Sequence, residues 1–335
     1  MMRIVTKFIA LIIIMGSFLL GWQLMQYNAF LSEPLLKEGQ SRTFEVNPGS
    51  SVKSISRQLV REGYISNALY FEALVRLNQQ GGRLQAGEYY IDPQMTPEQF
   101  LTRITRGDVI QYSLTIIEGW SFKQLIEAIA QHPQVVHTLE GLTEQEIIEK
   151  LNLNGQHPEG WFLPDTYHFP KGTTDVDFLN RSLKAMQIAL ETAWPERKPD
   201  LPLKTPYEAL ILASIVEKET GLASERRQIA GVFIRRLNKR MRLQTDPTVI
   251  YGMGDRFDGN IRRADLRRDT PYNTYTRRGL PPTPIALPSL DAIKAVLDPE
   301  AGKTLYFVSK GDGSHYFSSS LEEHNRAVRK YQLKR

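Results

Sequence analysis

One long apolar segment near the N-terminus constrains the fold of this chain most. Apolar residues fill nearly every position in Phe8–Trp22 and continue to Met25, close to the length of about 20 residues that crosses a bilayer as a helix. Arg3 and Lys7 precede the segment, and positive charge of this kind keeps a flank in the cytoplasm. A cleaved signal peptide is the alternative, but no small-residue cleavage site follows. We therefore expect an uncleaved anchor over residues 1–28, with the rest of the chain on the far side of the membrane.

Length and composition exclude several classes of protein. A chain of 335 residues is longer than one hydrophobic core usually serves, so we expect at least two folded units. It has no cysteine, which excludes disulfides, zinc ribbons and thiol nucleophiles. Its histidines show no metal-ligand spacing, and we expect neither a metal nor a cofactor. The net charge of +5 is compatible with an anionic partner, but no nucleic-acid-binding motif accompanies it.

Three segments share the order of a strand, a turn and an apolar helix. In the first, Phe44–Val46 alternates in polarity and a Pro-Gly turn follows. Ser51 then precedes apolar residues at helical spacing, as a helix N-cap does. The order returns at Tyr90-Ile91 and at Ile116-Ile117. A repeat of this kind predicts small strand–helix modules, and we place Ile116–Ala130 at a junction.

The first of these segments resembles the opening of a LysM domain, which is a small carbohydrate-binding module. Its turn, Gly49–Ser51, lacks the acidic residue of the LysM pattern. A structural unit without a ligand is the alternative. We expect an α+β chain in which a small LysM-like module over residues 40–110 precedes a larger mixed domain over residues 111–335.

The larger domain contains an irregular segment that is typical of binding sites. Thr270–Pro282 is rich in proline, tyrosine and asparagine, too irregular for a helix or strand, and long ordered loops commonly line sites. Near the end of the chain we predict strands at Thr304–Val308 and His315–Phe317 and a helix from Leu321. Trp161 and Tyr167 fit packing in a core better than stacking on sugars.

Two glutamates lie two residues apart at the end of a predicted helix, Tyr207–Glu219. At about 100° per residue, Glu219 falls on a stripe with Ile215 and Val216, whereas Glu217 points away from it. A carboxylic acid on an apolar stripe is costly to ionise, which raises its pKa. This is what a general acid for a glycosidic oxygen requires.

Pairing with basic neighbours is the alternative for both glutamates. Lys218 is adjacent, and Arg226 and Arg227 follow the turn at Gly221. Helical periodicity alone does not decide between an acid catalyst and an ion pair.

Four motifs resemble the MltG (YceG-like) family of endolytic murein transglycosylases. They are Ala213–Thr220, Arg242–Gly252, Tyr272–Tyr275 and Gly279–Pro282, and the resemblance extends over nearly the whole chain. In that family the catalytic glutamate is the second of the Glu-x-Glu pair, which corresponds to Glu219. The resemblance and the helical projection therefore indicate the same residue.

The resemblance implies cleavage of the MurNAc-β-1,4-GlcNAc bond of nascent peptidoglycan without water, which leaves a 1,6-anhydroMurNAc end and terminates strand elongation. It also implies a single-pass protein of the bacterial inner membrane with its catalytic domain on the periplasmic side, and cooperation with peptidoglycan synthases. A hydrolytic muramidase and a non-catalytic murein-binding scaffold are the alternatives.

Five polar and aromatic residues in these motifs are candidates for contact with the substrate, because they carry donors, acceptors and flat faces suited to sugars. They are Gln244, Asp246, Tyr272, Asn273 and Tyr275. Packing and turn formation within the loops is the alternative for each of them.

Overall fold

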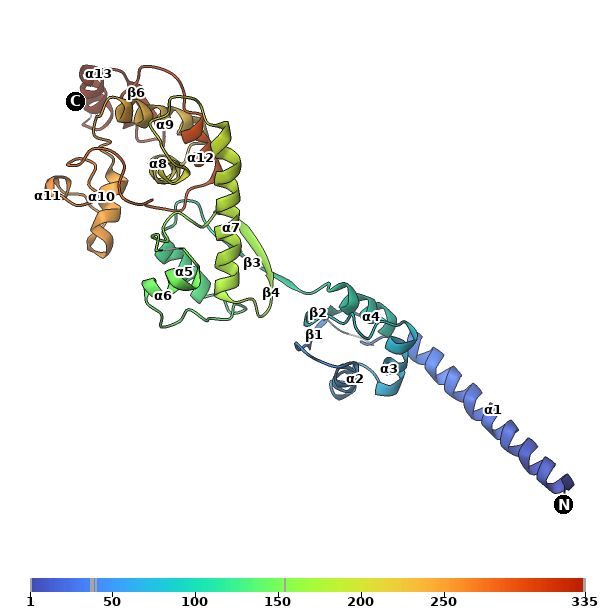
Figure 1. Ribbon diagram of the computed structural model, residues 1–335. Helices are drawn as coiled ribbons and strands as arrows, with labels where there is room; N and C mark the ends of the chain where they lie inside the picture. The colour runs from blue at the N-terminus through green and yellow to red at the C-terminus, as the bar shows by residue number, and fades with distance from the viewer. Residues whose placement is uncertain (1, 37–38, 40, 154, 334–335) are drawn as a thin grey trace. The chain divides into compact units, whose positions relative to one another are not determined.

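We describe the chain from a computed structural model that covers residues 2–36, 39, 41–153 and 155–333 (Figure 1). The chain forms two compact units, Met1–Tyr112 with Phe169–Gly172, and Ser113–His168 with Thr173–Arg335. Helices and short strands occur in both units, so the fold class is α+β, as predicted.

A long apolar helix, α1 (Met2–Ser32), begins the first unit. Its stretch Ile4–Ser32 is long and apolar enough to cross a membrane, and none of the most apolar part is buried within the protein. The end of α1 is different, because Phe30 is buried in the core of the unit and Gln23 accepts a hydrogen bond from the Tyr70 hydroxyl at 3.0 Å. The predicted apolar helix is therefore confirmed, and it extends beyond residue 28.

The rest of the first unit is a two-stranded sheet with three helices. Its elements are β1 (Arg42–Val46), α2 (Val52–Arg61), α3 (Ala68–Leu77), β2 (Gly87–Ile91) and α4 (Pro97–Arg106). The strands pair antiparallel with Phe44 opposite Tyr89, and both rings meet Phe100 edge to face. Ser51 caps α2 as predicted, through a hydrogen bond from the Ser54 N–H to its side chain.

The third predicted strand lies earlier in the chain than expected. Strand β3 (Gln111–Thr115) ends before Ile116 and pairs with β4 (Thr166–Pro170). Ile116 is buried in the following loop, where its N–H donates to the Asp165 carbonyl at 2.9 Å. The prediction mistook a buried loop residue for part of a strand. The helix that follows, α5 (Phe122–Ala130), lies in the segment where a helix was predicted, and it begins after a Ser121 cap.

Helix α8 (Pro206–Glu219) occupies the centre of the second unit (Figure 1). It contacts four other helices, α7 (Asp175–Ala193), α9 (Ala223–Asn238), α10 (Asp246–Met253) and α12 (Leu290–Leu297). Every residue of α8 from Ala209 to Val216 is buried as a result. The sequence predicted a helix over these residues correctly, but the single apolar stripe was wrong, since α8 is buried all round.

Shorter elements complete the second unit. They are α6 (Glu144–Lys150), the 3₁₀ helices η1 (Trp194–Glu196) and η2 (Gly254–Arg256), α11 (Arg263–Arg267), β5 (Tyr306–Ser309), β6 (His315–Ser318) and α13 (Leu321–Tyr331). Strands β5 and β6 form the predicted hairpin, against which α13 packs. The predicted irregular segment has neither helix nor strand. Trp161 stacks on Tyr207 in the core, with ring centroids 5.6 Å apart, as favoured above.

Candidate active site

Glu219 is the last residue of α8 and lines a cavity of about 520 Å³. The wall of this cavity comes from the end of α8, the segment that leads into α10, the irregular segment at Tyr275, and the C-terminal hairpin with α13. Its polar lining includes Glu219, Arg236, Gln244, Asp246, Tyr275, Tyr306, His315 and His324. The cavity therefore surrounds one glutamate with hydrogen-bonding groups and aromatic rings.

The surroundings of Glu219 favour its protonated form. The side chain is partly buried, and the Thr245 hydroxyl donates a hydrogen bond to its carboxylate. Burial raises the pKa of Glu219 to about 7, and the Asp246 carboxylate adds to this rise, whereas the Thr245 hydrogen bond and the Arg236 guanidinium act against it. Among the described residues Glu219 makes no ion pair within 4.0 Å. A carboxyl group of this pKa can both give and take a proton near neutral pH.

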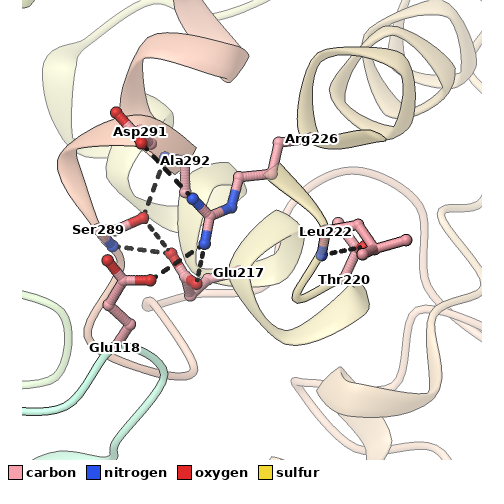
Figure 2. A network of polar contacts seen from close by, with 8 residues as sticks. All are labelled: Glu118, Glu217, Thr220, Leu222, Arg226, Ser289, Asp291 and Ala292. Carbon is pink, nitrogen blue, oxygen red and sulfur yellow. Dashed lines mark hydrogen bonds and ion pairs between the residues drawn. The ribbon is translucent and has the colours of Figure 1, made fainter. Parts of the chain in front are cut away.

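Glu217 lies in a different environment, a network of ion pairs and hydrogen bonds that Figure 2 shows. Its carboxylate is 3.2 Å from the Arg226 guanidinium and accepts hydrogen bonds from Ser289, at 2.9 Å from the backbone N–H and 2.5 Å from the hydroxyl. Arg226 also contacts Glu118 at 3.0 Å and Asp291 at 3.7 Å. The pairing alternative therefore describes Glu217, but not Glu219.

Three of the five predicted substrate-contact residues meet in the cavity with Glu219. They are Gln244, Asp246 and Tyr275. The Tyr275 hydroxyl donates to the Asp246 carboxylate at 2.6 Å, which holds both side chains. Gln244 has a φ of 52°, a conformation that few residues other than glycine adopt, and its N–H donates to the Thr274 carbonyl at 3.2 Å. The segment that leads into α10 is thus tied to the irregular segment beside Glu219.

The other two predicted residues lie outside the lining of this cavity. Asn273 is 1% exposed, and its side-chain amide donates to the carbonyls of Asp265, Leu266 and Arg268. Its side-chain oxygen accepts from the Tyr275 N–H at 2.8 Å. The Tyr272 hydroxyl bonds to that of Thr283, and its ring packs edge to face on Tyr251. The structure gives both residues a role in shaping the loop, as the alternative for them supposed.

Sequence analysis missed several residues that contribute to the cavity. Thr245 lies inside the Arg242–Gly252 motif, but nothing in that motif shows that its hydroxyl reaches Glu219. Arg236, Tyr306 and His324 carry no motif of their own, and the last two come from the C-terminal part of the chain. Folding alone brings them to Glu219. Among the described residues, no group of three or more His, Asp or Glu side chains is placed to hold a metal ion.

A second glutamate with a raised pKa lies outside this cavity. Glu159 is 2% exposed, and burial raises its pKa to about 7. It accepts hydrogen bonds from the Phe122 N–H at 2.9 Å and the Tyr251 hydroxyl at 3.2 Å. The Glu159 carboxyl group therefore accepts a hydrogen bond from the first residue of α5. A raised pKa does not by itself identify a catalytic acid.

Comparison with known proteins assigns the family. A model of the YceG-like family matches residues 44–330, and the chain belongs to this family. A Bacillus subtilis protein named endolytic murein transglycosylase is 33% identical over 340 residues, which cover 96% of this chain and 91% of the relative. The predicted family and the prediction of an enzyme are both confirmed.

Two further relatives agree with this assignment. A Streptococcus pneumoniae protein of the same name is 29% identical over 322 residues, covering 85% of this chain and 57% of the relative. A crystal structure of a YceG-like protein from Listeria monocytogenes is 32% identical, covers 87% of this chain and all of that one, and aligns with a TM-score of 0.54.

Proposed function

We propose that this protein is an endolytic murein transglycosylase that cleaves the MurNAc-β-1,4-GlcNAc bond of nascent glycan strands. The name of its relatives supports this activity. The observation that carries the proposal is the position of Glu219, a carboxyl group with a pKa near 7 at the wall of an open, polar cavity. A general acid of this pKa is about half protonated at pH 7, so it can supply the proton that cleavage of a glycosidic bond requires.

In the proposed reaction Glu219 acts first as an acid and then as a base. It gives its proton to the glycosidic oxygen as the bond from that oxygen to the muramyl C1 breaks. The muramyl C6 hydroxyl oxygen then forms a bond to C1, and its proton returns to the Glu219 carboxylate. Water is neither consumed nor released, and the products are a 1,6-anhydroMurNAc end and a GlcNAc with a free C4 hydroxyl. A single carboxyl group suffices, unlike the pair that hydrolytic glycosidases use.

Neighbouring groups in the cavity are suited to hold the sugars. We propose that Gln244, Asp246 and Tyr275 contact the glycan strand, since all three line the cavity with Glu219. Direct contact by Tyr272 and Asn273 stays a prediction. We also propose a LysM-like module in the first unit. The order of its elements supports this proposal, because β1, a turn with Gly49 at a φ of 77° and the capped helix α2 follow one another.

The proposed location follows from the apolar helix and the charges before it. We propose that α1 spans the inner membrane with Arg3 and Lys7 in the cytoplasm, so that the second unit faces the periplasmic side. There it would meet glycan strands as peptidoglycan synthases extend them, and cleavage would limit their length. A reporter fused after Arg335 should then be active outside the cytoplasm.

Mass spectrometry of the products tests the chemistry directly. The unmutated chain, incubated with purified murein glycan strands, should cut them at internal bonds and produce shorter strands with new anhydroMurNAc ends. New reducing ends would instead identify a hydrolytic muramidase, in which Asp246 could serve as the second carboxylate. Binding of the strands with no new ends of either kind would identify a scaffold.

A further inference from the structure

Arg236 is a buried cation at the wall of the cavity that holds Glu219. It is 7% exposed, and among the described residues no carboxylate lies within ion-pair distance of it. A buried charge is costly unless other groups compensate it. Here carbonyl oxygens and an aromatic face do so. The Nε atom donates to the Leu305 carbonyl at 2.6 Å, and Nη1 donates to the Leu243 carbonyl at 2.7 Å.

These contacts fix the guanidinium and leave one of its nitrogens unused. Nη1 also reaches the Arg242 carbonyl at 3.3 Å, and the Tyr306 ring lies 5.1 Å from the guanidinium carbon. Within the described ranges, Nη2 makes no hydrogen bond, and it is not among the buried polar atoms that lack a partner. The Nη2 donors are therefore open to solvent, on a side chain that lines the cavity.

We propose that Arg236 binds an acceptor oxygen of the glycan strand, either an amide carbonyl or a carboxylate, next to Glu219. This inference rests on the proposed function. A fixed guanidinium with free N–H groups suits such an oxygen, because hydrogen bonds from a charged donor are short and strong. Murein offers these oxygens in two places, on the sugars with their acetamido and lactyl groups and on the stem peptides. Arg236 would then help to place the scissile bond against the Glu219 carboxyl group.

The neighbouring arginine provides a matched control. Arg235 also lies on α9 and ties it to the same stretch of chain, with Nε donating to the Thr304 carbonyl at 2.6 Å. Its other two nitrogens are occupied, Nη1 by the Glu300 carbonyl at 2.8 Å and Nη2 by the Thr304 hydroxyl at 2.6 Å. Arg235 does not line the cavity. The two arginines thus share a structural role, but only Arg236 has a donor to spare for a ligand.

The test compares Arg236→Lys with Arg235→Lys in the full chain, on intact murein glycan strands and on strands freed of stem peptides. Lysine keeps the charge but loses the planar fork, so it cannot hold the carbonyls and also reach the substrate. Arg236→Lys should lower kcat/KM by about 10- to 100-fold, the worth of a hydrogen bond to a charged group. Arg235→Lys should leave kcat/KM nearly unchanged, while both variants lose a similar amount of thermal stability.

The two substrates identify the oxygen that Arg236 binds. A loss on both substrates would indicate an acetamido or lactyl group of the sugars, and a loss confined to intact strands would indicate the stem peptides. Equal kcat/KM for the two variants at similar unfolding temperatures would overturn the inference. If Arg236→Lys does not fold, Arg236→Gln replaces it, since its amide can still donate to a carbonyl.

Binding to an inactive chain separates this inference from the proposed function. Glu219→Gln should bind peptide-free strands, and adding Arg236→Lys should weaken that binding by a similar factor if an acetamido or lactyl group of the sugars is the ligand. Failure of the unmutated chain to cleave, together with failure of Glu219→Gln to bind, would refute the proposed function itself. Normal cleavage and binding that Arg236→Lys does not change would refute only the role of Arg236.

Discussion

Glu217 and Glu219 are the same chemical group, two residues apart on one helix, in opposite electrostatic environments. The Glu217 carboxylate meets the Arg226 guanidinium and two donors of Ser289 (Figure 2). Among the described residues, the Glu219 carboxylate receives one hydrogen bond, from Thr245, and it faces a cavity that also holds Asp246. The first environment fixes a negative charge in place, whereas the second makes that charge costly.

This difference shows how α8 combines anchoring with reactivity. The network around Glu217 joins the end of α8 to the start of α12 and to Glu118 in the loop before α5. Lys218 adds a hydrogen bond to the Gly119 carbonyl at 3.1 Å. The last turn of the helix is therefore held from one side, and Glu219, which forms no ion pair with any described residue, lines the cavity. We expect the two glutamates to respond differently to the same substitution.

Replacing Glu219 should have the largest effect. Glu219→Gln keeps the shape of the side chain but removes the proton that it transfers, so cleavage should fall by about 10² to 10⁴-fold, the usual worth of a general acid–base group. Folding and binding of glycan strands should survive. Counting anhydroMurNAc ends by mass spectrometry measures the loss. Full activity in Glu219→Gln would show that the proposed catalyst is wrong.

Replacing Glu217 should affect stability more than chemistry. Glu217→Gln removes the charge that Arg226 meets inside the network, although Glu118 and Asp291 still face that guanidinium. We expect a loss of about 1–3 kcal/mol in the free energy of unfolding, the cost of weakening a buried charged contact. Denaturant unfolding measures this loss, and cleavage by the folded protein should remain well above that of Glu219→Gln. The opposite ranking of the two activities would reverse the roles assigned here.

The pH dependence of cleavage should follow Glu219. Because the reaction begins with a protonated acid and burial raises the pKa of Glu219 to about 7, kcat/KM should fall above pH 7, by about tenfold per unit. Glu159→Gln is the control, since the pKa of Glu159 is also raised to about 7 but its side chain lies outside the cavity. Its profile should keep the decline above pH 7. Loss of that decline in Glu159→Gln would show that Glu159 causes it and that its assignment to Glu219 is wrong.

The sequence predicted local features well because they depend on short patterns. The apolar helix, the Ser51 cap, the C-terminal hairpin and the helix that ends at Glu219 all follow from patterns among neighbouring residues. The mistaken apolar stripe on α8 has a physical reason. A helix packed on all sides by other helices shows no polar face, so periodicity cannot tell which side a given residue occupies.

The remaining features of the site depend on contacts between distant segments. Nothing near Glu217 in the sequence shows that Ser289 donates to it, and nothing near Glu219 shows that Arg236 lies at the same cavity. Asn273 illustrates the same limit, because an amide suited to sugars is used instead to bind three backbone carbonyls. Residue type indicates what a side chain can bind, and the fold decides what it meets.

Removing the Thr245 hydroxyl should have the smallest effect and should sharpen the contrast between the glutamates. The hydrogen bond from Thr245 lowers the pKa of Glu219, against the effect of burial. Thr245→Val keeps the volume of the side chain but removes the donor, so the pKa should rise further and the decline in kcat/KM should move up by about half to one pH unit. Thr248→Val is the matched control, since the Thr248 hydroxyl bonds to the Thr245 carbonyl at 2.8 Å and does not touch Glu219. A pH profile that moves down in Thr245→Val, or equally in both variants, would contradict direct control of Glu219 by this hydroxyl.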